Sequence, residues 1–465
     1  MLVDNEVNVS GSSLSIDEVR SRVVPVAGLI VAVALLTAAQ VWASIHGTLG
    51  PLHSLLDDYL ANPQSAFVSW AGLGLACVGV PARVRIVSLG GAAVLDLLTL
   101  GVQAACGWHV SIGTGPTLAL TALVVTVSRW DGQRRRTALH AIAFGVLLIM
   151  ASKLADTWLT ISIVNGPRVL DQYVQLADRA LGEPAWLVGR ALEALGPVPS
   201  AVLHVVYIQL PVAAVVVAAW QLRHVTTSPW PRHNLLRTFL VLGVIGPLGY
   251  VLFPVVGPVF AYGSLGHGLQ IGDWPQVWPA MTSVPKPMLF DSVTARNCMP
   301  SMHTAWATAL FIHSRVGPRW LRWAGAFWLV CTLLATLGFG YHYGCDLVAG
   351  AVLCLTVESA LREPDRGWDR YRVRVVTLGA AVLAGLLLSY RFLAVTMAEY
   401  PVAAGFAVLG ALAAVIAVFH ATWFAAPDSR WAQWGGRDAF DSTGVAADWQ
   451  LAQQNPDNSR EVPKG

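Results

Sequence analysis

Two short segments carry the polar residues of this chain that could transfer a phosphoryl group. One, Arg296–Leu310, reads RNCMPSMHTAWATAL and contains His303; the other, Gly338–Gly350, reads GFGYHYGCDLVAG and contains His342 and Asp346. An imidazole can attack phosphorus and form a covalent intermediate, which divides one displacement into two steps. A carboxylate can fix the tautomer of that imidazole, and a second histidine can protonate the leaving alkoxide, because histidine titrates near neutral pH. We therefore predict that His303, His342 and Asp346 are catalytic.

The same residue types also have plainer explanations. A histidine and an aspartate four residues apart can be a structural pair or metal ligands, and two histidines with a carboxylate can hold zinc. The chain has no HExxH segment, which a zinc hydrolase of that type would add. We therefore predict a reaction that uses no metal and no other cofactor. Single histidines on apolar segments, such as His313, are expected to pack or to form hydrogen bonds between helices.

The composition sets the class of protein. The chain has 465 residues, of which 55% are hydrophobic and 12% charged, and its mean hydropathy is +0.57. Soluble globular proteins carry about a quarter charged residues. A net charge of +3, without a basic patch that includes aromatic residues, gives no indication of a nucleic-acid partner. We predict an all-α integral membrane protein.

The apolar stretches between charged residues predict about twelve transmembrane helices, each near the ~20 residues that a bilayer requires. Their predicted limits are 23–45, 66–80, 86–106, 110–128, 138–160, 200–222, 236–257, 300–314, 323–342, 344–361, 375–396 and 402–424. Twelve helices also suit a secondary transporter, which would show paired halves and broken helices near the bilayer midplane. No internal repeat is visible, and the polar motifs concentrate at the ends of helices instead.

The distribution of Lys and Arg predicts the orientation of these helices. If the N-terminus is cytoplasmic, 23 of the 30 basic residues fall on the cytoplasmic side, six fall outside and one lies within a span. Cytoplasmic loops of membrane proteins carry this excess of basic residues. We predict a multi-pass protein of the cell membrane with both termini in the cytoplasm. His303, His342 and Asp346 then lie at one depth on the extracytoplasmic face.

The predicted helices divide the chain into six parts. They are a disordered cytoplasmic leader (1–19), N-terminal transmembrane helices (20–164), an extracytoplasmic amphipathic segment (165–199), a core (200–361), C-terminal transmembrane helices (362–424) and a disordered cytoplasmic tail (425–465). We expect Trp186 to anchor the amphipathic segment at the outer membrane interface. A disulfide between Cys298 and Cys345, which flank the site, is geometrically conceivable.

The two motifs resemble those of the type 2 phosphatidic acid phosphatase (lipid phosphate phosphatase) superfamily. More narrowly, Pro300–His303 and His342–Asp346 are similar to the P-S-x-H and H-Y-x-x-D motifs of the branch that contains inositol phosphorylceramide synthase and sphingomyelin synthase. Tyr250–Pro258 is similar to an aromatic and proline element that precedes the long loop in those synthases. The resemblance covers about Val202–Leu361 and implies a six-helix lipid-phosphatase-like core.

The resemblance implies a metal-independent mechanism through a phosphohistidine. His342 would be the nucleophile, Asp346 its orienting carboxylate and His303 the general acid for the leaving group. His342 and Asp346 are four residues apart, so they share one face if the helix is continuous there.

This chain departs from the phosphatase branch at the residues that hold phosphate. That branch has Ser-Arg shortly before the nucleophile, where this chain has Ala335 and Thr336, and the Lys-x6-Arg-Pro motif is also absent. Ser301 and the backbone amides beside it could donate to phosphate oxygens at a helix N-terminus. Arg296 and Lys286 are candidate cations for the phosphate, although each can also be a solvated loop charge.

The missing arginines favour a transferase over a phosphatase. The predicted donor is a lipid or lipid-linked phosphate in the bilayer, and the predicted acceptor is an alcohol such as an inositol, sugar or lipid hydroxyl. A phosphatase of the same superfamily, which acts with water on a lipid phosphate or polyprenyl pyrophosphate, is the alternative. No motif identifies the donor, the acceptor or the oligomeric state.

Overall fold

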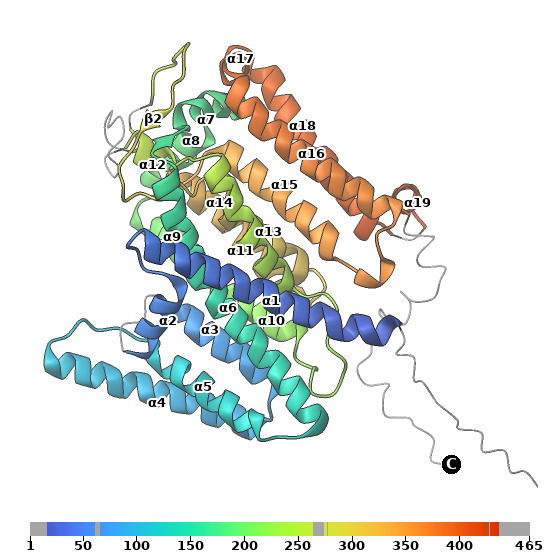
Figure 1. Ribbon diagram of the computed structural model, residues 1–465. Helices are drawn as coiled ribbons and strands as arrows, with labels where there is room; N and C mark the ends of the chain where they lie inside the picture. The colour runs from blue at the N-terminus through green and yellow to red at the C-terminus, as the bar shows by residue number, and fades with distance from the viewer. Residues whose placement is uncertain (1–15, 61–65, 264–273, 277, 427, 437–465) are drawn as a thin grey trace, which may run out of the picture.

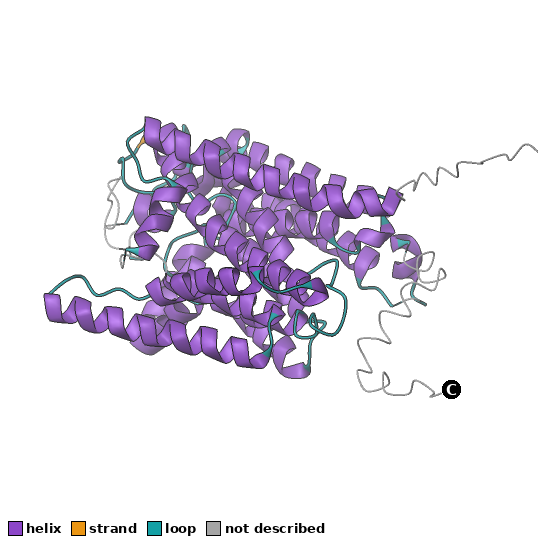
Figure 2. Cartoon of the chain, turned by 60° about the horizontal axis from the view of Figure 1, so that its bottom comes forward, coloured by secondary structure: helices purple, strands orange, loops and turns teal. Residues whose placement is uncertain are grey.

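The computed structural model describes residues 16–60, 66–263, 274–276, 278–426 and 428–436. Of the described residues, 75% are helical and 1% lie in strands, and Figure 2 shows helices running through the molecule with only short loops between most of them. This secondary-structure content, with seven candidate membrane spans among the described residues, is consistent with an all-α membrane protein. The predicted leader before residue 16 and the predicted tail after residue 436 lie outside the described residues.

The N-terminal part of the chain forms a layer of helices on one side of the molecule (Figure 1). Its elements are α1 (Ile16–Ile45), α2 (Pro51–Tyr59), α3 (Ala66–Ala76), the 3₁₀ turn η1 (Cys77–Gly79), α4 (Ala82–Cys106), α5 (Thr114–Ser128) and α6 (Gly132–Asn165). Helix α3 packs on α5 and α6, and α6 also contacts the central helices. The layer is therefore joined to the rest of the protein along α6.

The central part carries both motifs. Its elements are β1 (Arg168–Val169), α7 (Asp171–Asp178), η2 (Arg179–Leu181), α8 (Pro184–Leu195), α9 (Pro197–Ile208), α10 (Leu210–Gln221), α11 (Leu235–Leu252), α12 (Pro258–Ala261), β2 (Met288–Leu289), α13 (Met302–Ser314), α14 (Arg319–Gly338) and α15 (Gly344–Leu361). Strands β1 and β2 pair antiparallel, with Arg168 opposite Leu289. This pairing fastens the long loop before α13 to the segment after α6.

The C-terminal part covers α15 on its other side. Its elements are η3 (Pro364–Arg366), α16 (Arg370–Phe392), α17 (Ala394–Glu399), α18 (Pro401–Trp423) and α19 (Arg430–Gly435). In α15, 72% of the most apolar window is buried, against 17–44% in the other six candidate spans. Helix α15 is thus the central helix of the bundle, between α13 on one side and α16 and α18 on the other.

The predicted number of twelve transmembrane helices is not confirmed. Among the described residues, seven helices are long and apolar enough to cross a membrane, or eight if α9 and α10, which meet at 53°, form one span. The other predicted spans exist as helices, but some are short: α3 has 11 residues, α5 has 15 and α13 has 13. At 1.5 Å per residue, α13 covers only about 20 Å of a hydrocarbon layer about 30 Å thick.

The segment predicted as amphipathic (165–199) forms a folded cap at one end of the bundle. Trp186 is fully buried, and its ring lies 4.9 Å from that of Trp274 and 6.5 Å from that of Tyr343. The expected role of Trp186 as an interfacial anchor is therefore wrong, because the aromatic residues of the loop before α13 cover it. Figure 1 shows α7, α8 and α17 at one end of the bundle, and the start of α1 and α19 at the opposite end.

Candidate active site

The first motif forms the start of α13. Ser301 is the N-cap residue, and its Oγ accepts hydrogen bonds from the amide and the hydroxyl of Thr304, at 3.3 and 3.0 Å. The Ser301 amide donates to the backbone oxygen of Asp346 at 3.1 Å, which joins the two motifs directly. A Cβ on Gly350 of α15 would lie 2.3 Å from the Ser301 oxygen, so this close approach requires glycine. The Ser301 hydroxyl serves the helix cap, and its contact with phosphate stays a prediction.

The second motif spans a break between two helices. Helix α14 ends at Gly338 and α15 begins at Gly344, so His342 and Asp346 do not lie on one continuous helix. They are close because Asp346 caps α15: its Oδ2 accepts the amide of Tyr343 at 2.7 Å, which turns the carboxylate toward the preceding loop. Nδ1 of His342 then lies 3.5 Å from Oδ2 of Asp346. The predicted pairing of His342 with Asp346 is therefore present, but it results from the cap of α15 and not from a continuous helix.

His303 faces the same point from α13. Its ring centroid lies 6.4 Å from that of His342. Tyr207 of α9 stacks on the His303 ring at 4.0 Å, and the Tyr207 hydroxyl lies 3.1 Å from Nδ1 of His303. The structure thus brings His303, His342 and Asp346 together, and it adds Tyr207, which lies 96 positions before His303 and shares no motif with it.

Cys298 is a further member of this group. Its Sγ lies 2.6 Å from Oδ2 of Asp346 and 3.3 Å from Nδ1 of His342. Burial raises the pKa of the Cys298 thiol well above its ordinary value, and the Asp346 carboxylate raises it further. The neutral thiol therefore donates to Asp346. The other oxygen of that carboxylate, Oδ1, is buried without a hydrogen-bond partner among the described residues.

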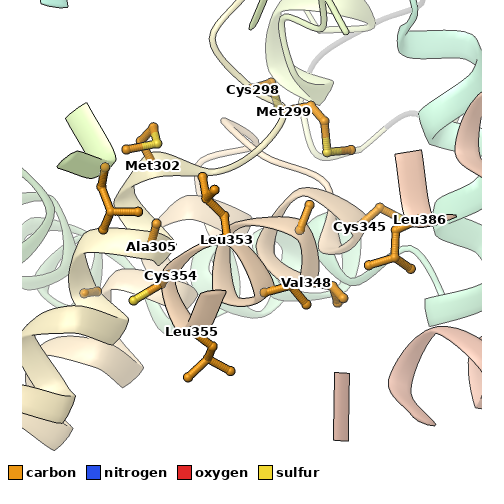
Figure 3. Close-up of a cluster of buried hydrophobic side chains, with 14 of the residues drawn as sticks. Cys298, Met299, Met302, Ala305, Cys345, Val348, Leu353, Cys354, Leu355 and Leu386 are labelled. Carbon is orange, nitrogen blue, oxygen red and sulfur yellow. The ribbon is translucent and has the colours of Figure 1, made fainter. Parts of the chain in front are cut away.

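The conceivable disulfide between Cys298 and Cys345 does not form, since both are free thiols. Figure 3 shows Cys298 on the segment ahead of α13 and Cys345 beside Leu386 of α16. Both side chains belong to one buried hydrophobic cluster, in which Cys298 bonds Asp346 and Cys345 lies beside α16.

Two buried acids of α7 hold the loops that carry the motifs. Asp171 accepts hydrogen bonds from the amides of Val256 and Gly257, at 3.1 and 3.0 Å, and from the hydroxyl of Tyr343 at 2.9 Å. Asp178 accepts the amide of Cys345 at 2.9 Å. Burial raises the pKa of each carboxyl to about 7, although these hydrogen bonds act in the opposite direction.

Asp171 and Asp178 were not among the predicted site residues, because an amphipathic helix is expected to lie at a surface with its polar residues exposed. The available signal was their spacing. Asp171 and Asp178 are seven residues apart, two helical turns, so they lie on one face with Val174 between them. All three residues are fully buried.

The candidate phosphate-binding cations do not point to the histidines. Arg296 is buried, and its guanidinium donates to the backbone oxygens of Gly166, Thr294 and Asp291. Its amide donates to the hydroxyl of Ser162 on α6 at 3.1 Å. Arg296 therefore organises the loop before the first motif. Lys286 is exposed in the same loop, and a phosphate contact for either residue stays a prediction.

These features define a class: a mostly helical protein with several apolar helices of membrane-spanning length and a site of two histidines and a carboxylate at one end of the bundle. Residues 174–359 match the family model of the PAP2 superfamily, and residues 23–161 match a domain of unknown function (DUF5933). No curated protein and no solved structure matches the chain. The first match supports the type 2 phosphatidic acid phosphatase superfamily, and with it a phosphatase or phosphotransferase.

Proposed function

We propose that the protein is a membrane phosphotransferase that moves a phosphate-containing head group from a lipid or lipid-linked donor to an alcohol acceptor through a phosphohistidine. The observation that carries this proposal is the arrangement of the two histidines. Asp346 lies beside Nδ1 of His342, so Nε2 is the nitrogen left to attack phosphorus. His303 is close enough, at 6.4 Å between ring centroids, for one phosphoryl group to contact both rings.

In the first step, the lone pair of His342 Nε2 forms a bond to phosphorus while the bond from phosphorus to the leaving oxygen breaks. His303 gives a proton to that oxygen. Asp346 accepts the Nδ1–H of His342 and stabilises the positive charge that the ring acquires. In the second step, His303 takes the proton of the acceptor hydroxyl, whose oxygen attacks phosphorus and releases His342.

Tyr207 supports His303 in both steps. Its hydroxyl can accept the Nδ1–H of the protonated ring and can donate to Nδ1 of the neutral ring. Because this bond occupies Nδ1, the proton exchanged with substrate is carried by Nε2. The reaction needs no metal, since nucleophile, orienting carboxylate and acid are all side chains.

The phosphate oxygens would be held at the start of α13. The amides of Met302 and His303 open this helix, and the first amides of a helix have no acceptor within it. Such amides, with the helix dipole, favour a bound anion. We propose Lys286 and Arg296 as additional contacts that form only with substrate bound.

The acceptor separates the two branches of the superfamily. We favour an alcohol, as in the branch that resembles inositol phosphorylceramide synthase, because Ala335 and Thr336 replace the phosphatase Ser-Arg pair. The test is free phosphate release by the purified protein from a lipid phosphate, with and without an added alcohol. A transferase gives little free phosphate and a new phosphate monoester of the added alcohol. Full-rate release without an alcohol would establish the phosphatase instead.

A further inference from the structure

Three different ligand atoms converge on one point behind the proposed nucleophile. They are Sγ of Cys298, Nδ1 of His342 and Oδ2 of Asp346, which lie within 4.8 Å of one another and belong to buried side chains. Cysteine, histidine and aspartate are a common ligand set of Zn²⁺. We propose that these three residues form an inhibitory site for a thiolate-binding divalent cation, with Zn²⁺ as the best fit.

The distances between the three atoms are close to those of a tetrahedral zinc site. Bond lengths of about 2.0–2.3 Å at tetrahedral angles place the ligand atoms about 3.4–3.6 Å apart. Sγ and Nδ1 are 3.3 Å apart, and Nδ1 and Oδ2 are 3.5 Å apart. Only the distance between Sγ and Oδ2, at 2.6 Å, must increase, by about 1 Å.

The carboxylate of Asp346 can make this adjustment. Its Oδ2 now receives both the Cys298 thiol and the Tyr343 amide, whereas Oδ1 has no partner among the described residues. A small rotation of the carboxylate lengthens the distance from Sγ to Oδ2 and also lets Oδ1, which has no partner in the described part of the chain, contact the cation. The thiol proton of Cys298 is released to solvent on binding. A divalent cation with one thiolate, one carboxylate and one neutral imidazole has no net charge, which favours it in a buried site.

Metal binding and catalysis require opposite tautomers of His342. A cation bound to Nδ1 takes the lone pair of that nitrogen, so the ring proton must reside on Nε2. Nε2 then has no lone pair to attack phosphorus, and Asp346 can no longer orient the ring. The cation would therefore inhibit the enzyme without touching substrate. This inhibitory effect rests on the proposed role of His342, whereas the binding itself does not.

A second cluster with suitable residue types serves as a contrast. In the described chain, His233, His313 and Glu358 also bring ligand atoms together. The amide of Leu235 donates to Oε1 of Gln221, so Nε2 of Gln221 donates to Nδ1 of His313. The ring proton of His313 is then on Nε2, where it bonds Glu358 at 3.1 Å. His313 therefore has no lone pair left for a cation, and this cluster is joined by hydrogen bonds.

The test is titration of the reduced, detergent-solubilised full-length protein with Co²⁺, which substitutes for Zn²⁺. Binding to Cys298 produces a near-ultraviolet thiolate-to-cobalt charge-transfer band. We expect the band to saturate at one equivalent and to disappear on addition of Zn²⁺. Absence of any such band in the wild-type protein would overturn the proposal, and this outcome requires no variant.

Two cysteine variants test whether the charge-transfer band arises from Cys298, and a third variant tests the Asp346 ligand. Cys298→Ser should abolish it, while Cys345→Ser, which alters a neighbouring buried thiol, should retain it. Loss of the Asp346 ligand in Asp346→Asn should weaken Co²⁺ binding by more than the ~10–100-fold that an outer-sphere change costs. Persistence of the band in Cys298→Ser would contradict the proposal.

Measuring phosphoryl transfer by the same samples distinguishes a failure of the metal site from a failure of the proposed phosphotransferase function. If Zn²⁺ inhibits phosphoryl transfer with the affinity that displaces Co²⁺, both proposals are supported. A thiolate band in a protein without phosphotransferase or phosphatase activity would refute the function alone. Phosphoryl transfer through His342 without a thiolate band would refute the metal site alone.

Discussion

At the residue scale, His342 presents its two ring nitrogens to different surroundings. Nδ1 faces the carboxylate of Asp346 and the thiol of Cys298, and Nε2 is the nitrogen that attacks phosphorus in the proposed mechanism. His303 is placed in the same way, because Tyr207 occupies its Nδ1. Each histidine therefore has one nitrogen that is held by the protein and one that is available for chemistry. This division follows from contacts between distant parts of the chain, which the motifs alone do not specify.

His303→Gln removes the proposed acid without changing the fold of α13. We expect kcat to fall by about 10²–10⁴-fold, the usual contribution of general acid–base catalysis. The loss should be smaller for a donor whose leaving group needs no proton, such as a p-nitrophenyl phosphate ester. Comparison of kcat for the two donors is the measurement. An equal loss for both would contradict the role of His303 as an acid.

Tyr207→Phe keeps the ring stacked on His303 and removes only the hydroxyl. A hydrogen bond of this kind contributes about 0.5–1.5 kcal/mol, so we expect kcat to fall by roughly threefold to tenfold. Tyr59→Phe is the control, since it removes a hydroxyl bonded to Thr121 at 2.8 Å in the N-terminal layer. Equal rates for Tyr207→Phe and the wild type would show that the hydroxyl does not act on His303.

At the element scale, the site depends on the close approach of α13 and α15. The backbone of Ser301 touches α15 at Gly350, and its amide bonds the Asp346 oxygen. The cap formed by α7 and α8 then fixes the loop that carries His342, through Asp171, Asp178 and Trp186. The helices that carry the motifs were predictable from apolar stretches, but the contacts that align them were not.

Gly350→Ala places a methyl group where the Ser301 oxygen lies, 2.3 Å away. Overpacking of this kind costs about 1–3 kcal/mol of stability, and a displacement of about 1 Å at a site can cost 10²-fold in rate. We therefore expect a large loss of kcat with a modest decrease in Tm. Gly385→Ala on α16 is the matched control, because nothing lies within 4 Å of its added Cβ. Similar losses in both variants would contradict the proposed contact.

The acids of α7 should make stability depend on pH. Burial raises the pKa of Asp171 and of Asp178 to about 7 from an unfolded value of 3.8. Between these values the folded protein holds protons that the unfolded chain releases, so their contribution to stability is complete below pH 3.8 and is lost as pH rises to about 7. Asp171→Asn should reduce this dependence.

The measurement is Tm in detergent between pH 5 and pH 8 for the wild type and Asp171→Asn. The variant should also be less stable overall, since its amide group meets a backbone donor that the carboxylate accepts. An unchanged dependence of Tm on pH in the variant would show that Asp171 does not titrate in this range.

At the scale of the whole molecule, the helical membrane class was predictable from the sequence, and the three residues that the motifs single out do lie together in the fold. The predicted number of twelve transmembrane helices is not confirmed, because an apolar stretch does not fix helix length: α13 begins only at Met302, after its cap, and spans 13 residues. Tyr207, Cys298 and Asp171 were missed as members of the site. Their contacts join residues 44 to 172 positions apart; the spacing of Asp171 and Asp178 indicates a shared face of α7, but no local pattern identifies the distant partners.

The parts of the molecule are also more closely joined than the predicted boundaries suggest. Ser162 and Gly166, at the end of the N-terminal layer, bind Arg296 just before the first motif. The short helix α19 packs on α18 within the segment predicted as a tail. The N-terminal layer therefore supports the loop that precedes the site.

The predicted orientation can be tested with single cysteines. Ser283 lies in the exposed loop near the site, and Trp368 is 64% exposed at the opposite end, between α15 and α16. In a Cys106→Ser background, a membrane-impermeant maleimide should label Ser283→Cys in intact cells and Trp368→Cys only after lysis. The reverse pattern would place the site on the cytoplasmic side.

The central claim is that His342 carries the phosphoryl group during turnover. The most direct measurement is rapid quenching of the enzyme with a phosphorus-labelled lipid donor, followed by peptide mapping of the protein. We expect an acid-labile, base-stable phosphoramidate on the peptide that contains His342, and no label or turnover in His342→Gln. Turnover by His342→Gln, or label on another residue of the wild-type protein, would contradict it.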